Sequence, residues 1–440
     1  MRQELKDGLI LRSLDEGHAS DRENLAEFYK DTFGDAGDDD AKELIPWVDD
    51  LLSDEHPTTE PADFWVVVDP ANDDKIASAI LHIPQTWRYD DIDLSAGRIE
   101  LVATDKDYRN RGLVRVQFEA AHERCASLGQ VIQGVTGIPH YYRKFGYAMT
   151  VNLGAMGWLP LASIPKLKDD KEPEFTLRDA TEADIPDLMR WHDGHTATKR
   201  MSLVRDESIW RFELVHRSAN TPMSLDYKII VNKEGRGVGY VAYNLGYTFG
   251  SFRIFEYVVG AESSVLASFD DTMRGLKAVA EAHTGTNGET PWRIYFNNGA
   301  HPAVETLITG TNGHIAASTY AWYIRVADIV AFLKTIVPVL ERRLVGSGAN
   351  GYTGEMTVAF HNQRGVKFHF EGGKIKDITD EEIYWADSAF PYDTFLNVVF
   401  GHRSITEIHH ILPEAYANKK ARVLLEAMFP AGDTALEGMA

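Results

Sequence analysis

At 440 residues, with 44% hydrophobic and 25% charged residues, the chain is too long for one ordinary core and has the composition of a soluble protein of two or three domains. Its formal net charge of −21 argues against non-specific nucleic-acid binding. The sequence has no apolar run of about 18 residues that would predict a membrane span, and its polar start has no signal segment. The single cysteine, Cys125, excludes an internal disulfide, and we expect a cytoplasmic protein.

The acidic residues are concentrated near the N-terminus. Residues 31–63 contain twelve carboxylates and one lysine, Lys42, a balance of −11 (1 − 12) and about half of the excess in the whole chain. This stretch is compatible with a solvated surface that keeps the protein in solution. It is also compatible with an electrostatic field that draws in a cationic amine. The sequence alone leaves both interpretations open.

The first strands are indicated by two apolar runs, Phe64–Val68 and Ile76–Ile83, separated by a turn of Asp, Asn and Pro residues. A third run begins at Val102 as a buried strand and passes through a polar turn into an Arg-x-x-Gly corner, Arg109–Gly112. A helix follows, because apolar residues recur at helical spacing from Val114 to Leu128. Gly129 is placed to end that helix in a left-handed cap.

A glycine-containing turn that leads from a strand into a helix points free main-chain N–H groups at one spot. The helix dipole adds about half a positive charge there. The sequence therefore predicts an anion site for a phosphate or pyrophosphate, with Arg109 and Arg111 beside it.

A second motif follows a short apolar strand, Val131–Val135: it reads Tyr-Arg-Lys-Phe-Gly-Tyr over residues 142–147. Together the two motifs resemble the GNAT superfamily of acyl-CoA-dependent N-acyltransferases. In that family Arg-x-x-Gly-x-(small) binds the pyrophosphate of coenzyme A, and Tyr-x-(Lys/Arg)-x-Gly-(Phe/Tyr) closes the fold. Val114 departs from the family pattern, which has Gly or Ala there.

The resemblance implies acetyl-CoA as co-substrate. It implies pyrophosphate contacts, mainly through the main chain, from Arg109, Asn110, Arg111, Gly112, Leu113 and Val114. Val102 and Thr104 would pair with the pantetheine arm as an added strand does.

Acetyl transfer to an amine needs a proton donor for the departing thiolate, and a phenol suits that task. Tyr142 occupies the motif position that the family uses as general acid; a packed tyrosine bonded to the main chain is the alternative. For the base, the resemblance implies the terminal carboxylate, here that of Ala440, although relatives usually end in an aromatic residue. Glu100 is the alternative base, acting through a water molecule, unless it is a charge at the strand edge.

The acceptor amine is expected near the first helices, with Asp31, Phe33 and Trp47 as candidate contacts, since aromatic and acidic groups together suit a cation. No metal is expected. His192 and His195 lack a third ligand in view and are expected to be structural. His402, His409 and His410 lack the spacing of a zinc helix.

The pattern restarts after a linker at 160–173. A strand and a capped helix over Phe175–Leu188 are similar to the opening of a GNAT domain, and a hairpin and a strand ending at Val259 follow. No Arg-x-x-Gly corner comes next, so we expect a GNAT-like fold that has lost its coenzyme site.

The last part of the chain is expected to hold an amphipathic helix over Val330–Leu344, a hairpin, and mostly helical segments over Ile383–Phe400 and Ile405–Phe429. This order resembles a sterol-carrier-protein fold. The whole chain then resembles the Eis (enhanced intracellular survival) family, on residues 142–147, 322–328 and 400–404.

The expected fold class is therefore α/β (α+β), with two tandem GNAT-like domains and a sterol-carrier-like domain. The expected divisions are a catalytic domain (1–158), a degenerate GNAT-like domain (159–318) and a C-terminal domain (319–440). The expected function is acetyl-CoA-dependent N-acetylation of a cationic small molecule, aminoglycoside- or polyamine-like, without nucleic acid or membrane as partner. The alternative is a non-catalytic acyl-CoA- or lipid-binding protein. The resemblance also implies a hexamer.

Overall fold

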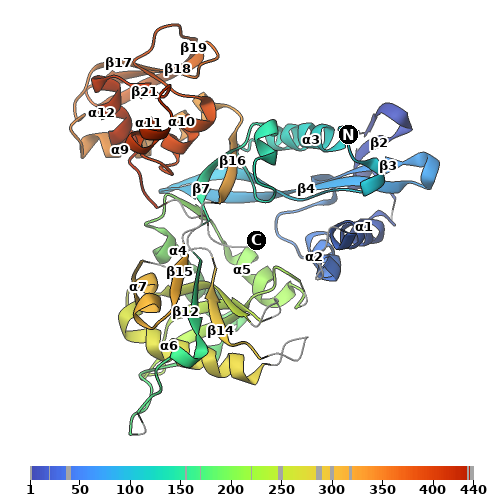
Figure 1. The fold of residues 1–440 in the computed structure, drawn as a ribbon, viewed down its shortest axis with the longest axis vertical. Helices are drawn as coiled ribbons and strands as arrows, with labels where there is room; N and C mark the ends of the chain where they lie inside the picture. The colour runs from blue at the N-terminus through green and yellow to red at the C-terminus, as the bar shows by residue number, and fades with distance from the viewer. Residues whose placement is uncertain are drawn as a thin grey trace.

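The computed structural model describes residues 2–18, 20–35, 41–153, 156–168, 170–219, 221–245, 251–283, 290–297, 302–316, 320–433 and 436. Within these residues the strands form three sheets, and helices cover them (Figure 1). The chain is thus a mixed α/β protein, as the sequence predicts. None of the described helices combines the length and apolar character that a membrane crossing requires.

The first sheet, as far as the chain is described, has nine strands and is covered on both faces. Its path is β1 (Arg2–Glu4), β2 (Ile10–Ser13), β3 (Phe64–Asp69), β4 (Lys75–Tyr89), β5 (Ile92–Thr104), β6 (Ile132–Val135), β16 (Ala321–Val326) and β7 (Ala148–Asn152), and β10 (Met201–Leu203) pairs with β4. Helix α3 (Leu113–Ser127) lies on one face, and α1 (Asp21–Asp35) and α2 (Leu44–Leu51) lie on the other (Figure 1).

This double cover explains the unbroken apolar run of β3. Trp65 and Val67 pack on the α3 side, while Phe64, Val66 and Val68 pack against α1 and α2. A strand buried on both faces has no need of polar residues at alternate positions. Cys125 is fully buried within α3, so its predicted place in the core is confirmed.

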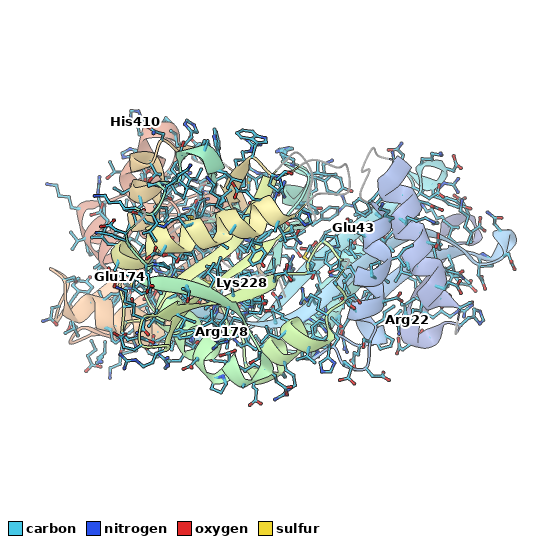
Figure 2. The ribbon with its side chains drawn as sticks, turned by 90° about the horizontal axis from the view of Figure 1, so that it is seen from below. Arg22, Glu43, Glu174, Arg178, Lys228 and His410 are labelled. Carbon is cyan, nitrogen blue, oxygen red and sulfur yellow. The ribbon has the colours of Figure 1, made fainter. Side chains whose placement is uncertain are left out.

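The second sheet has the order β15 (His314–Ala316), β8 (Met156–Pro160), β14 (Arg293–Phe296), β13 (Ser251–Val259), β12 (Gly237–Asn244), β11 (Asp226–Asn232) and β9 (Phe175–Asp179). Figure 2 shows Arg178 and Lys228 on the neighbouring strands β9 and β11. The helices that accompany the second sheet are α4 (Ile185–Thr196), α5 (Glu207–Arg211), the π-helical turn η10 (Phe212–His216), α6 (Val265–Ala282) and α7 (Pro302–Gly310).

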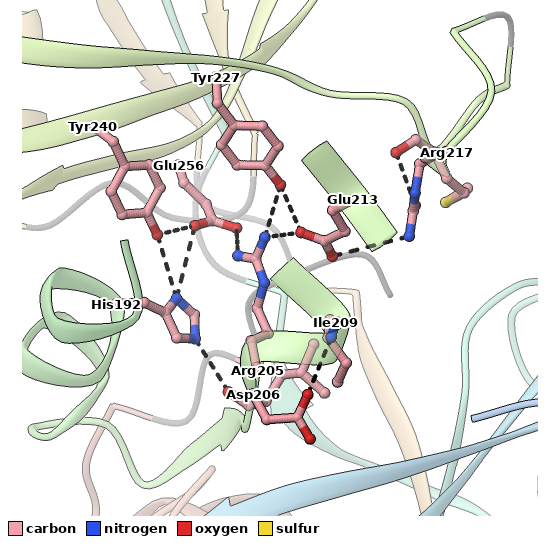
Figure 3. A network of polar contacts seen from close by, with 11 residues as sticks. His192, Arg205, Asp206, Ile209, Glu213, Arg217, Tyr227, Tyr240 and Glu256 are labelled. Carbon is pink, nitrogen blue, oxygen red and sulfur yellow. Dashed lines mark hydrogen bonds and ion pairs between the residues drawn. The ribbon is translucent and has the colours of Figure 1, made fainter. Parts of the chain in front are cut away.

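A buried polar network ties the second sheet to the first (Figure 3). Arg205 lies two residues after the end of β10, which belongs to the first sheet. Its guanidinium is buried against the strands of the second sheet. Its Nη1 donates to Glu256 at 2.7 Å, its Nη2 donates to the Tyr227 hydroxyl at 2.7 Å, and it pairs with Glu213. His192 lies in the same network, with its Nε2 3.2 Å from the Leu203 carbonyl oxygen.

The third sheet has the order β19 (Lys374–Glu382), β18 (Arg364–Glu371), β17 (Gly354–Ala359), β20 (Ser388–Ala389) and β21 (Tyr416–Ala417). Its helices are α8 (Ile329–Thr335), α9 (Val337–Val345), α10 (Tyr392–Val399), α11 (Ile405–Ile411) and α12 (Lys419–Met428). Its core continues into the far end of the first sheet, where the Tyr89 hydroxyl donates to the Val399 carbonyl at 2.6 Å.

Several elements differ from the sequence prediction. The helix expected over Val330–Leu344 is two helices, because Pro338 lies in the first turn of α9 and cannot continue the turn before it. The segment from residue 383 becomes helical only at Tyr392. Strand β16 begins just after the boundary expected at residue 319, yet it pairs with β6 and β7 of the first sheet.

Candidate functional site

A cleft of about 660 Å³ opens where β5 ends, between the start of α3, the short helix η7 (Tyr141–Phe145) and α1. The cleft brings both sequence motifs together. Ten of the predicted site residues line it: Phe33, Val102, Thr104, Arg109, Asn110, Arg111, Gly112, Leu113, Val114 and Tyr142.

A β-bulge shapes the floor of the cleft. Leu101 has a φ of +50°, in the left-handed region. Ile99 packs on the α3 side of the sheet, whereas Leu101 and Ala103 pack on the side of α1 and α2. Residues two apart in a regular strand face the same side, so β5 reverses its facing here, and its register with β4 shifts at the same place.

The bulge coincides with the point where β5 and β6 part. Their parallel pairing ends at Ile99 and Val135. Beyond it, within the described chain, Val102 and Thr104 have β4 on one side and no strand on the other, where the cleft lies. An extended ligand arm with amide groups can therefore add to this edge as a strand would.

The start of α3 supplies the anion-binding end of the cleft. Asn110 and Gly112 both have left-handed backbones, with φ of +66° and +79°, and Gly112 caps the helix. This curl directs the first main-chain N–H groups of α3, which have no intrahelical partner, toward the cleft. The helix dipole favours an anion at the same point.

Tyr142 lies at the inner end of the cleft, with 5% of its surface exposed. Phe118 and Tyr323 pack edge-on against its ring, with centroids 6.0 and 5.6 Å away. Its hydroxyl rests against Gly137, where an added Cβ would lie 2.8 Å from the oxygen. Burial, with the charge of Glu100 as a smaller cause, raises the pKa of Tyr142 above its ordinary value, so the phenol stays protonated near neutral pH.

The candidate base Glu100 lies near Tyr142 but is already paired. Its Oε1 is 2.6 Å from Nη2 of Arg98, and Arg98 is 6% exposed and lies over the Trp322 ring. Arg98 and Glu100 are two residues apart on one strand, so their side chains share a face. This spacing alone indicates that the two side chains can pair. The other candidate, Ala440, lies outside the described residues.

Of the acceptor candidates, only Phe33 lines the cleft. Asp31 is exposed and 3.6 Å from the Lys30 ammonium. Trp47 is 6% exposed and packs in the core of α1 and α2, as expected for the apolar face that it shares with Leu44 and Leu51.

Much of the acidic stretch is paired within the protein. Asp49 accepts from Arg22 at 3.0 Å and so fastens α2 to α1. Asp63 is fully buried between His82 and Arg124. Asp38, Asp39 and Asp40 lie outside the described residues.

Sequence reasoning missed part of the cleft lining. Tyr141, the residue before the second motif, lines the cleft and is half-buried. Arg115, in the first turn of α3, and Lys144, inside the second motif, also line it. Arg115 directly follows the first motif and Lys144 lies inside the second, but which wall they face depends on how η7 packs against α3.

The comparisons with known proteins agree with this geometry. Residues 14–150 match the model of the acetyltransferase (GNAT) domain family. Among proteins with curated descriptions, none matches the chain significantly.

Solved structures share the fold over the whole chain. A probable N-acyltransferase from Enterococcus faecalis V583 has a TM-score of 0.68 at 13% identity, covering 98% of this chain and 100% of that one. A GCN5-related N-acetyltransferase from Anabaena variabilis has a TM-score of 0.68 at 14% identity, covering 98% and 100%. Eis1 from Mycobacterium abscessus has a TM-score of 0.62 at 13% identity, covering 98% and 99%.

Proposed function

We propose that this chain, whose residues 14–150 form a GNAT acetyltransferase domain, transfers an acetyl group from acetyl-CoA to a primary amine of a cationic small molecule. The observation that carries the proposal is the single cleft that joins the free edge of β5, the start of α3 and Tyr142. These three features correspond to the pantetheine arm, the pyrophosphate and the departing thiolate of an acyl-CoA.

In the proposed reaction the amine nitrogen attacks the thioester carbonyl directly, in a complex that holds both substrates. The carbon–sulfur bond breaks, and the sulfur takes a proton from the Tyr142 hydroxyl. The nitrogen gives its proton to a base. A raised pKa keeps Tyr142 protonated until the thiolate forms.

The base in this proposal is the terminal carboxylate of Ala440, with Glu100 as the alternative. The pairing of Glu100 with Arg98 supports this order, because the Glu100 carboxylate is already engaged by a mostly buried guanidinium. Removal of Met439 and Ala440 tests it: we expect the turnover number to fall while coenzyme binding is kept. If turnover is unchanged, the terminal carboxylate is not the base.

The acceptor class that we propose is aminoglycoside- or polyamine-like. Phe33 and Ile138 give the cleft an apolar wall next to Tyr142, and the exposed carboxylates of α1, such as Asp31, lie on the helix that carries Phe33. An aromatic group with acidic residues nearby suits a cation.

The test is release of free thiol from acetyl-CoA with aminoglycosides, polyamines, amino acids and lysine peptides as acceptors. We expect rapid release with one class of cationic amine. If no amine supports release while calorimetry detects coenzyme A binding, the chain is instead a non-catalytic acyl-CoA- or lipid-binding protein.

We also propose the division into units 1–158, 159–318 and 319–440, with a sterol-carrier-like third unit, and a cytoplasmic hexamer. Light scattering coupled to size-exclusion chromatography tests the hexamer: a mass other than six times 49.3 kDa would contradict it.

A further inference from the structure

Among the described residues that line the cleft, every charged side chain is a cation. They are Arg109, Arg111, Arg115 and Lys144, in a chain whose net charge is −21. Among the described residues, none of the four forms an ion pair with a carboxylate. Arg109 donates to the Thr104 carbonyl at 3.3 Å, and Arg111 donates to the Asp107 carbonyl at 3.2 Å. Their positive charge is therefore left for a ligand.

The four cations form two pairs at different places. Arg109 and Arg111 belong to the turn before α3, beside its free N–H groups. Arg115 comes from the first turn of α3 and Lys144 from η7, and both lie over aromatic rings of η7. Two separate pairs of cations fit a ligand with two separate anionic groups.

Aromatic rings hold the second pair in place. The Arg115 guanidinium lies over the Phe145 ring at 5.7 Å from its centroid, and the Lys144 ammonium lies over the Tyr141 ring at 5.3 Å. Phe145 in turn stacks on Phe118 at 4.3 Å, which fixes the ring in the core. Cations held in this way over half-buried rings are fixed in position to neutralise a phosphate.

Coenzyme A carries its charge in two places, the pyrophosphate and the 3′-phosphate of the adenosine. The main-chain groups at the start of α3, with Arg109 and Arg111, match the pyrophosphate. We propose that Arg115 and Lys144 bind the 3′-phosphate and make the protein select coenzyme A over its 3′-dephospho form. This inference rests on the proposed use of acyl-CoA but not on acetyl transfer to an amine.

The test is calorimetric titration of the full chain with coenzyme A and with 3′-dephospho-coenzyme A. Because both ligands carry the pyrophosphate, the ratio of their dissociation constants reports the 3′-phosphate alone. We expect the wild type to bind coenzyme A about 10- to 100-fold more tightly, as for two charge-assisted contacts. In the double variant Arg115→Leu/Lys144→Leu that ratio should fall to about 1–3, with unchanged affinity for the dephospho form.

Two control variants separate this role from general electrostatics. Arg109→Leu should weaken both ligands and keep their ratio. Arg143→Leu removes a neighbouring charge of η7 that is 3.9 Å from Asp393 and does not line the cleft, so it should change neither affinity.

Equal affinities of the wild type for the two ligands would overturn the inference. So would a double variant that loses affinity for both ligands by the same factor. Failure of the proposed function shows differently: no amine supports thiol release, while the preference for coenzyme A persists in calorimetry.

Discussion

Tyr142 combines a raised pKa with a rigid aromatic setting. Rings from α3 and from β16 pack on it, and Gly137 leaves room for its hydroxyl. In the proposed mechanism the hydroxyl delivers the proton, so Tyr142→Phe should lower the turnover number about 10²–10⁴-fold and leave the dissociation constant of coenzyme A unchanged. Steady-state kinetics with the best amine, paired with calorimetry, checks this. A variant with wild-type turnover would remove Tyr142 from the mechanism.

His82 is a second residue whose protonation matters. It is fully buried, with Nδ1 3.1 Å from Asp63 and Nε2 2.7 Å from Gln130. Burial alone would lower its pKa, but the Asp63 carboxylate and Cys125 raise the pKa to about 9. In the unfolded chain the pKa is about 6.5. The folded state therefore binds the proton more tightly than the unfolded state does.

The free energy of unfolding should therefore fall as the pH rises. The stabilisation from protonated His82 is fully present below pH about 6.5 and is lost as the pH rises through about 9. It amounts to about 3–4 kcal/mol. Urea unfolding between pH 6 and 10 should show this fall in the wild type and a flatter profile in His82→Gln. Parallel profiles for the two proteins would refute the assignment.

At the scale of elements, the second unit fixes the wall of the cleft that carries Phe33. Asp50 of α2 is 7% exposed, and its carboxylate accepts from the Ser218 main-chain N–H at 2.9 Å and hydroxyl at 2.6 Å. Ser218 follows the π-helical turn η10. Helix α2 packs on α1, which supplies Thr32 and Phe33 to the cleft. The second unit thus holds this wall from outside.

Loss of the contact between Asp50 and Ser218 should weaken the binding of the acceptor more than the binding of the coenzyme. Ser218→Ala removes one of two hydrogen bonds to a buried carboxylate, at a cost of about 1–3 kcal/mol. We expect the KM of the amine to rise several-fold, with the KM of acetyl-CoA unchanged. Ser208→Ala is the matched control, because the Ser208 hydroxyl binds the exposed Asp206, away from α2. Equal changes in both KM values would argue against a role for α2 in acceptor binding.

Part of the cleft could be predicted from the sequence, and part could not. The part of the cleft that we propose binds the coenzyme depends on local patterns: a strand, a left-handed glycine and a helix start. Its residues could therefore be named from the sequence. The acceptor side depends on tertiary packing. Trp47 lies on the buried face of α2, and the Glu100 carboxylate pairs with Arg98. The pairing of β16 with β6 and β7 joins segments far apart in the chain, and no local pattern indicates it.

At the scale of the whole molecule, one ionic cluster joins the first sheet to α9 and to the segment after α12. Asp90, at the end of the β4–β5 hairpin, pairs with Arg200 at 3.0 Å and with Arg343 of α9 at 2.5 Å. Arg200 also donates to the Pro430 carbonyl, and the neighbouring Lys199 pairs with Asp433 at 2.6 Å. The β4–β5 hairpin, α9 and the segment after α12 therefore meet around Asp90 and the two arginines that pair with it.

Asp90→Ala would leave two mostly buried guanidiniums without their carboxylate. We expect a loss of about 2–4 kcal/mol in the free energy of unfolding. Asp91→Ala is the control: its pair with Arg342 is exposed on both sides, so its removal should cost less than about 1 kcal/mol. Denaturant titration of both variants checks the contrast. Similar losses would mean that the cluster does not join the units.

The place of β16 in the first sheet also concerns how the protein is made. Tyr323 packs on Tyr142, and the Tyr320 hydroxyl accepts from the Gly137 N–H, so the surroundings of the cleft come partly from this late strand. On a ribosome that adds about 5–20 residues per second, β16 emerges roughly 170 residues after β7, a delay of about 8–34 s. During that interval β6 and β7 lack the strand that lies between them. The first sheet of the nascent chain therefore stays incomplete, and so does the wall of the cleft, until β16 has been synthesised.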